Sequence, residues 1–458
     1  MNQGRTTLLT LGLLALVTLW DGCSRIEEVL ESIQPDLTPH ETYSQALGQA
    51  GLSESALAVA WREASRTALE SAVLIETPYL EAGYFASERP EASAYRIELK
   101  RGQALFVSVE VESGHPAQVF LDLFRAIPEG DGGSVEYRRL TGADSGVRRF
   151  EFEPSRDGEY VIRLQPELLR SIRFEISIRQ SASLAFPVHD HDSGAIRSGF
   201  GVDRDGGRRS HHGVDIFAPR GTPVLAVSDG EVSRVRTGGL GGRYIWVRDT
   251  KRGLSLYYAH LDRQLAHTGQ RVRLGDTLGL VGNTGNARST PPHLHFGVYR
   301  RGEGPIDPYN FIHQLPQDPP EIDVESGALG EWFRTAREGY LRSSHSARSP
   351  ERANLPRHTM VRIMAGVGRW YRVQLPDGLT GFVIGNLVET ADEAVGEAAV
   401  AAGQGLLEAP ASTALIEDRL AVDGKLPVLG RFAQYLYVRR VDGPAVWLQA
   451  GSGAVAPH

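Results

Sequence analysis

Three short runs in the middle of the chain hold the side chains best suited to chemistry. They read His211-His212-Gly213-Val214-Asp215, Tyr258-Ala259-His260-Leu261 and His293-Leu294-His295-Phe296. Imidazole nitrogens and a carboxylate oxygen are ligands that zinc takes in tetrahedral sites, and a catalytic zinc site keeps one position for water. Bound zinc acidifies that water and polarises a carbonyl, while neighbouring imidazoles move protons. The three runs therefore predict a zinc-dependent hydrolytic site.

The third run predicts a strand that presents two histidines to one side. Successive side chains of a strand point to opposite faces. His293 and His295 therefore point the same way, while Leu294 and Phe296 point into a core. The strand would place both imidazoles beside the other two runs.

The first run is also typical of a strand. The β-branched residues Val214 and Ile216, with Pro219 close behind, favour a strand over a helix. In such a strand His211 and Asp215 share one face, opposite the two apolar side chains. This alternation predicts that both residues face the metal.

A three-ligand set follows from these positions. His211, Asp215 and one histidine of the pair His293 and His295 would hold the ion, and the spacing leaves open which of the two it is. His260 and the remaining histidine are candidates for moving protons and stabilising the oxyanion. The His-Glu-x-x-His motif of other zinc proteases does not occur in the sequence, so no glutamate base is indicated by motif.

The segment from about Phe186 to Phe311 resembles the lysostaphin/LytM-type zinc endopeptidases of bacterial cell walls. The matching runs include Ser198-Gly199-Phe200-Gly201, Arg204-Asp205-Gly206-Gly207-Arg208, His211 through Pro219, Gly221-Thr222-Pro223-Val224, Tyr258-Ala259-His260-Leu261, Gly282-Asn283-Thr284-Gly285 and Pro292-His293-Leu294-His295-Phe296. The resemblance implies that His211, Asp215 and His295 bind one zinc ion per chain, and that His260 and His293 are the catalytic histidines. It also implies a zinc endopeptidase domain over residues 186–315 that cuts the peptide part of peptidoglycan.

Two alternatives from other functional classes stay open. Some relatives keep this fold without the zinc ligands and activate cell-wall amidases, so a non-catalytic wall-binding or amidase-activating regulator is one alternative. The presence of all five residues in this sequence favours an enzyme. The other alternative is a metallopeptidase that acts on glycine-rich proteins.

A second histidine cluster, His189-Asp190-His191-Asp192, is predicted to be a solvated polar loop.

Length and charge limit the remaining possibilities. A chain of 458 residues is expected to hold three or four domains. A formal net charge of −7 with a pI near 6.1 argues against a general nucleic-acid binder, so no nucleic-acid partner is expected. The resemblance to the lysostaphin/LytM family implies that peptidoglycan is the partner.

The N-terminus resembles an export leader over residues 1–23. Arg5 precedes an apolar run from Leu8 to Trp20, which is shorter than the ~20 apolar residues of a membrane span. Cys23, the only cysteine, stands where bacterial lipoproteins carry their lipid, although Trp20 and Asp21 depart from the usual motif. We therefore expect export to the cell envelope (the periplasm), with a lipid anchor at Cys23 on the outer membrane as the preferred form.

The rest of the chain predicts a mainly β, multidomain protein. Residues 26–80 are predicted to be helical with Ser53 as a cap, and strand-like alternation predicts a β-sandwich over 90–180. Residues 331–390 resemble a bacterial SH3-like barrel, and a weaker second copy is predicted over 405–450. The Ala/Glu/Gly-rich piece between Thr390 and Gln404 is predicted to be a hinge. In the barrel, Trp370 and Tyr371 are candidates for stacking on wall polymer or for core packing.

Overall fold

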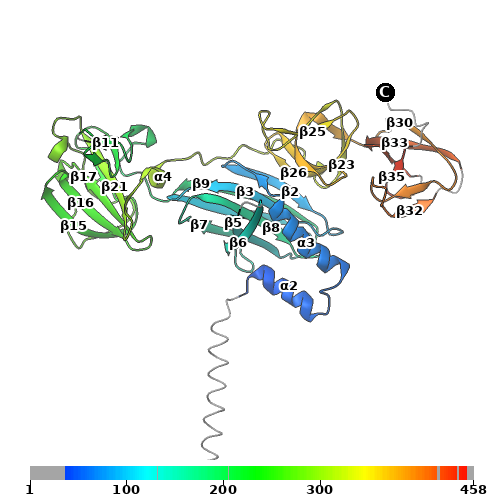
Figure 1. Cartoon of the computed structure of the whole chain (residues 1–458), viewed down its shortest axis with the longest axis horizontal. Coiled ribbons are helices and arrows are strands. Elements are labelled where there is room, and N and C mark those ends of the chain that lie inside the picture. Colours follow the sequence, from blue (N-terminus) through cyan, green and yellow to red (C-terminus); the bar gives the residue numbers. More distant parts are fainter. Residues whose placement is uncertain (1–36, 131–132, 205, 420–422, 441–442, 451–458) are drawn as a thin grey trace, which may run out of the picture. The chain divides into compact units, whose positions relative to one another are not determined.

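The computed structural model describes residues 37–130, 133–204, 206–419, 423–440 and 443–450 (Figure 1). The predicted leader, with Cys23, lies outside these residues. The chain divides into a short unit that ends at Val59 and a large unit that begins at Ala60. None of the described helices combines the length and the hydrophobicity that a membrane span requires.

Two helices open the described chain, α2 (Pro39–Gln49) and α3 (Ala56–Glu70). Thr38 caps α2 in a capping box, because its hydroxyl accepts from the Glu41 N–H and the Glu41 carboxylate accepts from the Thr38 N–H. Ser55 rather than the predicted Ser53 lies at the start of α3, where its hydroxyl accepts from the backbone of the third residue on. The predicted helical segment was too long, because helix ends at Glu70 and strands follow.

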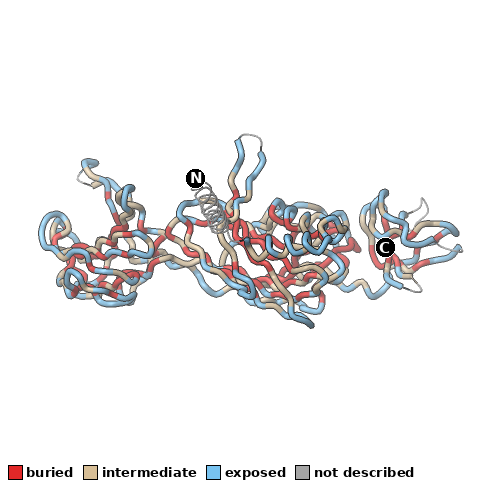
Figure 2. The backbone as a smooth tube through the Cα atoms, turned by 90° about the horizontal axis from the view of Figure 1, so that it is seen from below, coloured by how far each residue is buried: buried red, intermediate tan, exposed pale blue. Residues whose placement is uncertain are grey.

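A β-sandwich extends from residue 73 to residue 182. Its strands are β1 (Val73–Leu74), β2 (Tyr79–Phe85), β3 (Ser93–Leu99), β4 (Gln103–Glu112), β5 (Val119–Glu129), β6 (Ser134–Gly142), β7 (Arg149–Phe152), β8 (Gly158–Pro166) and β9 (Ile172–Ala182). One sheet has the order β1-β3-β8-β5-β6, and β2, β9, β4 and β7 follow one another in the other. Alternating apolar residues such as Leu105, Ile162 and Ile176 fill the space between the sheets. Figure 2 shows these buried stretches along the strands.

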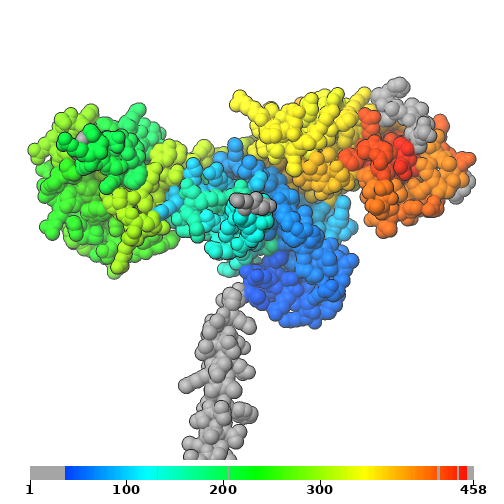
Figure 3. Space-filling view, viewed as in Figure 1, coloured from blue at the N-terminus to red at the C-terminus, as the bar shows by residue number. Residues whose placement is uncertain are grey.

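The next segment carries the predicted site and is drawn in green in Figures 1 and 3. Its main sheet has the order β10-β13-β21-β17-β16-β15-β19, with β22 beside β21, and a smaller sheet has the order β14-β20-β18. The elements are η1 (Ser193–Ala195), β10 (Ile196–Ser198), β11 (Asp203–Arg204), β12 (Arg209–Ser210), β13 (Val214–Phe217), β14 (Pro223–Leu225), β15 (Gly230–Gly238), β16 (Gly242–Asp249), β17 (Leu254–Ala259), β18 (Arg263–Gln264), β19 (Arg271–Val272), β20 (Thr277–Leu280), η2 (Gly285–Ala287), β21 (His293–Arg300), β22 (Gly304–Ile306) and α4 (Tyr309–Ile312). The core of this segment lies between the two sheets, where Val224 and Leu278 meet Leu256 and Phe296.

Two further β units complete the chain. The first comprises η3 (Ser326–Ala328), β23 (Trp332–Thr335), β24 (Gly339–Arg342), β25 (Glu351–Leu355), β26 (Met360–Val367), β27 (Trp370–Gln374), β28 (Thr380–Ile384), η4 (Gly385–Leu387) and β29 (Val388–Thr390). The second comprises β30 (Gly396–Val400), β31 (Gly405–Leu407), β32 (Ile416–Arg419), β33 (Gly424–Phe432), β34 (Tyr435–Val438) and β35 (Val446–Gln449). The predicted hinge was wrong, because strand β30 lies in it and pairs with β33. Trp370 and Tyr371 are 7% and 5% exposed, so both pack in cores and offer no stacking surface.

The sandwich and the first of these units share one sheet, because β26 pairs with β2. A buried ion pair lies at this junction, where Arg372 Nη2 donates to Glu81 Oε1 at 2.7 Å and Arg372 Nε donates to Glu81 Oε2 at 3.0 Å. The hydroxyls of Tyr79 and Tyr95 also donate to the Glu81 carboxylate, at 2.7 and 2.6 Å. Glu81 is fully buried, and these four hydrogen bonds compensate for its removal from water.

The observed structure is mainly β and multidomain, as the sequence predicted, with antiparallel pairing throughout the site-bearing segment. The assignment of the C-terminal units as SH3-like barrels remains a prediction.

Candidate metal centre

Two neighbouring strands position the centre. Strands β13 and β21 pair antiparallel, with Asp215 directly opposite His295. Residues opposite one another in such a pair project to the same face, with Cβ atoms ~5 Å apart. Leu294 and Phe296 are fully buried on the other face of β21, as the alternation predicted.

His211 reaches the centre by a different route from the one predicted. Strand β13 begins only at Val214, so His211 lies in the segment before the strand and does not alternate with Asp215. Two backbone hydrogen bonds fix this segment, one from the Gly201 N–H to the His211 carbonyl at 2.8 Å and one from the His211 N–H to the Val202 carbonyl at 2.9 Å. The imidazole then points back toward the carboxylate of Asp215.

Three donor atoms converge at the centre. His211 Nε2 lies 3.0 Å from Asp215 Oδ1 and 3.0 Å from His295 Nδ1, and His295 Nδ1 lies 3.1 Å from the same carboxylate oxygen. His211 and Asp215 are 4% and 8% exposed. Among the described residues, this is the cluster of histidine and carboxylate groups with the spacing to hold a metal ion.

The hydrogen bonds around the cluster favour a cation. His211 Nδ1 lies 2.6 Å from the Gly199 carbonyl, which can only accept, so this nitrogen carries the proton and Nε2 presents a lone pair. That lone pair faces a carboxylate oxygen and a second imidazole nitrogen. Three such donors at this spacing fit a transition-metal ion with mixed nitrogen and oxygen ligands.

The two other predicted histidines lie beside the cluster. The rings of His260 and His293 meet edge to face with centroids 5.1 Å apart, and His260 lies 5.8 Å from His295 by the same measure. His293 Nε2 is 4.0 Å from Asp215 Oδ1. Both rings use Nδ1 for a carbonyl, of Thr284 for His260 and of Pro291 for His293, each at 2.9 Å. Their Nε2 atoms thus remain available as acceptors.

His260 adopts a backbone conformation that L-residues rarely take. Its φ of 62° lies in the left-handed region, which costs roughly 1–2 kcal/mol for a residue with a Cβ. The His260 N–H donates to the Gly241 carbonyl at 2.9 Å, and this bond helps to hold the turn. The strained turn directs the imidazole toward the other histidines.

Gly213 provides the close approach that the centre requires. A Cβ at this position would lie 2.4 Å from the Phe296 carbonyl oxygen and 2.9 Å from the His295 ring. Only a glycine therefore lets the segment after His211 lie against β21.

Burial and hydrogen bonding set the charges of the centre. Burial acts to raise the pKa of Asp215, but the close contacts of its carboxylate with His211 and His295 outweigh burial and hold the pKa well below its usual range. Burial lowers the pKa of His260 to about 4, and the charges of His295 and His293 act in the same direction. Burial also lowers the pKa of His295. The carboxylate is therefore ionised and His260 is neutral at pH 7.

Sequence reasoning missed one residue of the centre. Arg204 Nη2 donates to Asp215 Oδ2 at 2.7 Å and to Ser198 Oγ at 2.7 Å. Arg204 is in the β11–β12 hairpin. In the sequence it belongs to one of the runs that resemble the family, and that resemblance gave it no role. The chain spacing between Arg204 and Asp215 gave no sign that a long side chain would reach back.

The predicted polar loop at His189–Asp192 stays apart from the centre. His189 Nδ1 lies 3.1 Å from Asp190 Oδ2, and both side chains are exposed. The described residues give this loop no third ligand within metal-binding distance, in keeping with a solvated loop.

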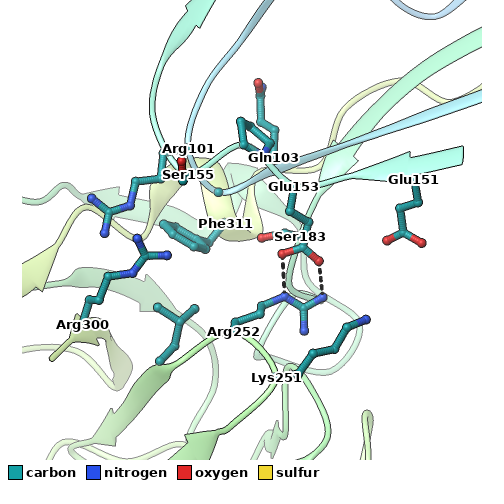
Figure 4. Close-up of a pocket in the computed structure, with 13 residues that line it drawn as sticks. Arg101, Gln103, Glu151, Glu153, Ser155, Ser183, Lys251, Arg252, Arg300 and Phe311 are labelled. Atoms are coloured by element: carbon teal, nitrogen blue, oxygen red, sulfur yellow. Dashed lines mark hydrogen bonds and ion pairs between the residues drawn. The ribbon is translucent and has the colours of Figure 1, made fainter. Parts of the chain in front are cut away.

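A cavity of about 450 Å³ lies elsewhere in the large unit, and charged side chains such as Arg101, Glu153 and Arg252 form part of its lining (Figure 4). Arg252 crosses it and donates through Nε and Nη2 to both carboxylate oxygens of Glu153, at 2.9 and 2.7 Å. Arg252 also pairs with Asp249 at 3.0 Å. Because these partners satisfy one another, the bidentate pair serves to link the sandwich strands to the β16–β17 turn.

The comparisons with known proteins now place this segment. Residues 209–308 match the family model described as Peptidase family M23, and all five predicted site residues lie within that range. The match confirms the resemblance to the lysostaphin/LytM family for this part of the chain.

Particular relatives share the same region. The chain is 41% identical over 127 residues to the peptidoglycan DD-endopeptidase ShyC of Vibrio cholerae, covering 27% of each chain. It is 39% identical over 139 residues to the L-Ala–D-Glu endopeptidase of Bacillus subtilis, covering 28% of this chain and 42% of the relative. The catalytic domain of lysostaphin from Staphylococcus simulans is 31% identical, with 25% of this chain and 89% of that chain covered and a TM-score of 0.23. The chain thus spans less than half the length of the curated relatives that it matches.

Proposed function

We propose that this protein is a zinc metalloendopeptidase that hydrolyses peptide cross-links of bacterial peptidoglycan. The observation that carries the proposal is the convergence of His211 Nε2, Asp215 Oδ1 and His295 Nδ1 beside two further histidines. The match to Peptidase family M23 supports the reaction class. Two relatives support the substrate, because both are named endopeptidases and one is named for peptidoglycan.

The ligand set fits zinc. His211, Asp215 and His295 would hold the ion, and zinc would supply a Lewis acid together with an acidified water. Arg204 donates to the second oxygen of Asp215, so one carboxylate oxygen is left facing the two imidazole nitrogens. The Gly199 carbonyl fixes the His211 ring in the tautomer that a ligand needs.

The remaining histidines carry the proton chemistry. His260 is neutral at pH 7, and its Nδ1 is engaged with the Thr284 carbonyl, so Nε2 accepts a hydrogen bond from the attacking water and orients it. The Nε2 of His293 lies 4.0 Å from Asp215 Oδ1. Either imidazole, once protonated, stabilises the oxyanion and returns a proton to the leaving amine.

We also propose that the protein works in the cell envelope. The leader over residues 1–23, with Cys23 as a lipid-attachment residue, supports export and anchoring at the outer membrane. Mass spectrometry of the N-terminal peptide from cells tests this point, because lipidation leaves an acylated Cys23 as the first residue. An unmodified Cys23 inside a longer N-terminal peptide would contradict it.

The decisive experiment is digestion of purified sacculi by the zinc-loaded protein, with soluble products resolved by mass spectrometry. Asp215→Ala is the inactive control, and His267→Ala, an exposed histidine of the same segment, is the matched active control. New peptide ends from the wild type and from His267→Ala, but not from Asp215→Ala, would establish the activity and identify the bond. A zinc-loaded protein that releases nothing from sacculi but activates an amidase would replace this proposal with the regulator. Cleavage of elastin-like protein without any release from sacculi would indicate a peptidase of proteins.

A further inference from the structure

The main sheet beside the metal centre has one face in the core and one face open. The core face carries four fully buried side chains, Ile245 and Val247 of β16 and Leu256 and Tyr258 of β17. The residues between them on the open face are aromatic and only partly buried. They are Tyr244 and Trp246 of β16, Tyr257 of β17 and Tyr299 of β21, and these four residues are called the aromatic face below.

The four rings form one contiguous surface. Trp246 lies at the middle, with ring centroids 4.6 Å from Tyr257 and 4.9 Å from Tyr299. Tyr244 joins the group through Tyr257, at 5.4 Å. Aromatic side chains on an open sheet face expose apolar surface to water, and contiguous surface of this kind marks binding sites more often than isolated residues do.

The aromatic face is continuous with the metal centre. The Tyr257 ring meets the His295 ring edge to face at 5.8 Å. On β21, Gly297 lies between His295 and Tyr299 on the same face, and it pairs with Tyr257 in register. A Cβ at Gly297 would lie 3.0 Å from the His212 carbonyl and 3.0 Å from the Tyr299 ring, so Gly297 is buried beneath the His212 backbone and the neighbouring ring. The Tyr257 ring is therefore the point at which the aromatic face reaches the metal ligands.

Basic side chains border the far side of the aromatic face. In the pairing of β15 with β16, Arg234 is opposite Trp246 and Arg236 is opposite Tyr244, and both arginines are exposed. Opposite residues share a face, so both arginines project on the open side. In the order β21-β17-β16-β15, strand β15 is three strand spacings from β21. At the usual distance between strands, this separation is ~14 Å. Carboxylates on a ligand that covers the rings would fall within reach of these guanidinium groups.

We propose that the aromatic face binds a sugar-bearing segment of the wall polymer and thereby delivers the attached peptide to the metal centre. Planar rings stack well against the C–H faces of pyranose rings, and arginine pairs with carboxylates, so the surface matches a polymer of amino sugars that carry acidic peptides. The proposal rests on the proposed function, because that function supplies the polymer. It adds that substrate choice depends on sugar as well as on peptide.

A binding experiment tests the proposal without relying on turnover. The full-length, zinc-loaded His260→Ala protein, in which turnover should be lost, is titrated with a soluble disaccharide-tetrapeptide and with the same tetrapeptide lacking sugar. Calorimetry gives the affinities, and the indole N–H signal of Trp246, assigned by its loss in Trp246→Phe, reports the place of binding. We expect the sugar-bearing ligand to bind at least tenfold more tightly and to shift this signal.

Variants of the face locate the effect. Trp246→Ala and Tyr299→Ala, each made in the His260→Ala protein, should weaken binding of the sugar-bearing ligand about tenfold, while Trp246→Phe should retain most of the affinity. Tyr309→Ala is the matched control, because Tyr309 is an exposed tyrosine of the same segment that stacks on His313 away from the sheet face. Zinc content and circular dichroism identify any variant that has lost its fold. Equal affinity for the two ligands, or unchanged affinity in both alanine variants, would overturn the proposal.

Turnover measurements distinguish a failure of this proposal from a failure of the proposed function. The wild type is given one cross-linked peptide dimer with its disaccharides and the same dimer without them. We expect Trp246→Ala to raise KM for the sugar-linked dimer about tenfold with little change in kcat, and to leave the sugar-free dimer unaffected. Equal kcat/KM of the wild type on both dimers contradicts the inference while the endopeptidase stands. If the wild type cleaves neither dimer, the proposed function is contradicted. The binding titration then still decides the inference.

Discussion

Arg204 Nη2 donates a hydrogen bond to Asp215 Oδ2 at 2.7 Å, while Oδ1 of the same carboxylate faces His211 and His295. The two oxygens of Asp215 therefore have separate tasks. One is held by a guanidinium on a neighbouring hairpin, and the other is directed at the cluster of ligand atoms. The relationship makes Arg204 a positioning residue for the metal ligand.

Replacing Arg204 tests this role. Arg204→Gln should weaken zinc binding by 10- to 100-fold, the range found when a group that orients a ligand is lost. Competition against a chromogenic chelator measures the affinity. Arg204→Lys should recover part of it, and Arg197→Gln, an exposed arginine of β10, serves as the control. Unchanged affinity in Arg204→Gln would show that the ion pair plays no part in metal binding.

Substituting a metal ligand and substituting a catalytic histidine should have different effects on metal content and turnover. His211→Ala removes a ligand and should abolish metal retention, whereas His260→Ala should keep the metal and lose turnover. Metal content by mass spectrometry, measured beside the release of peptides from sacculi, distinguishes the two. About one zinc per chain in His211→Ala would refute the ligand assignment.

Gly213, which lies against the His295 ring, should not tolerate substitution. A methyl group at position 213 would overlap the Phe296 carbonyl and the His295 ring, so Gly213→Ala should displace β21 from its partner segment and sharply lower metal affinity. Gly199→Ala is the matched control, because a Cβ at Gly199 meets no atom within 4 Å. Metal titrations of both variants check the prediction, and equal affinities would contradict it.

The metal-free protein should lose stability in mild acid. The pKa of His260 is about 4 in the folded state, against about 6.5 for an unperturbed histidine, so between these values the unfolded chain takes up a proton that the folded chain does not. Stability from this group is present above pH 6.5 and is lost as the pH falls toward 4, by about 2 kcal/mol at pH 5. Urea unfolding at pH 7 and pH 5, with His260→Gln as the reference, isolates the effect. An equal loss in both proteins would show that His260 is not its source.

Parts of this protein were predictable because the signals were local. The alternation in His293-Leu294-His295-Phe296 requires only a strand, and β21 has the predicted faces. The alternation of apolar residues in the sandwich likewise predicted strands where β4, β5, β7 and β8 lie. A regular period in the sequence is sufficient for such predictions.

Other features depend on contacts between distant segments and carry no local signal. His211 was expected in a strand, but hydrogen bonds with Gly201 and Val202 hold it before β13. Arg204 reaches Asp215 only because a hairpin folds back over the site. The Ala/Glu/Gly-rich composition between Thr390 and Gln404 suggested a hinge, yet residues 396–400 form a strand that pairs with β33. The partner strand thus overrides composition.

The shared sheet of β2 and β26 has a consequence for how this protein can be divided. A protein shortened before β23 would expose the edge of β2 to other chains and would leave the carboxylate of Glu81 in the interior without its guanidinium. Losing one partner of a buried pair costs about 3–5 kcal/mol, enough to erase much of a domain's stability. The sandwich and the unit that follows the peptidase-like segment therefore depend on each other, although residues 183–359, including that whole segment, lie between β9 and β26. The segment with the metal centre is thus an insertion, in sequence, between strands that belong to one shared sheet.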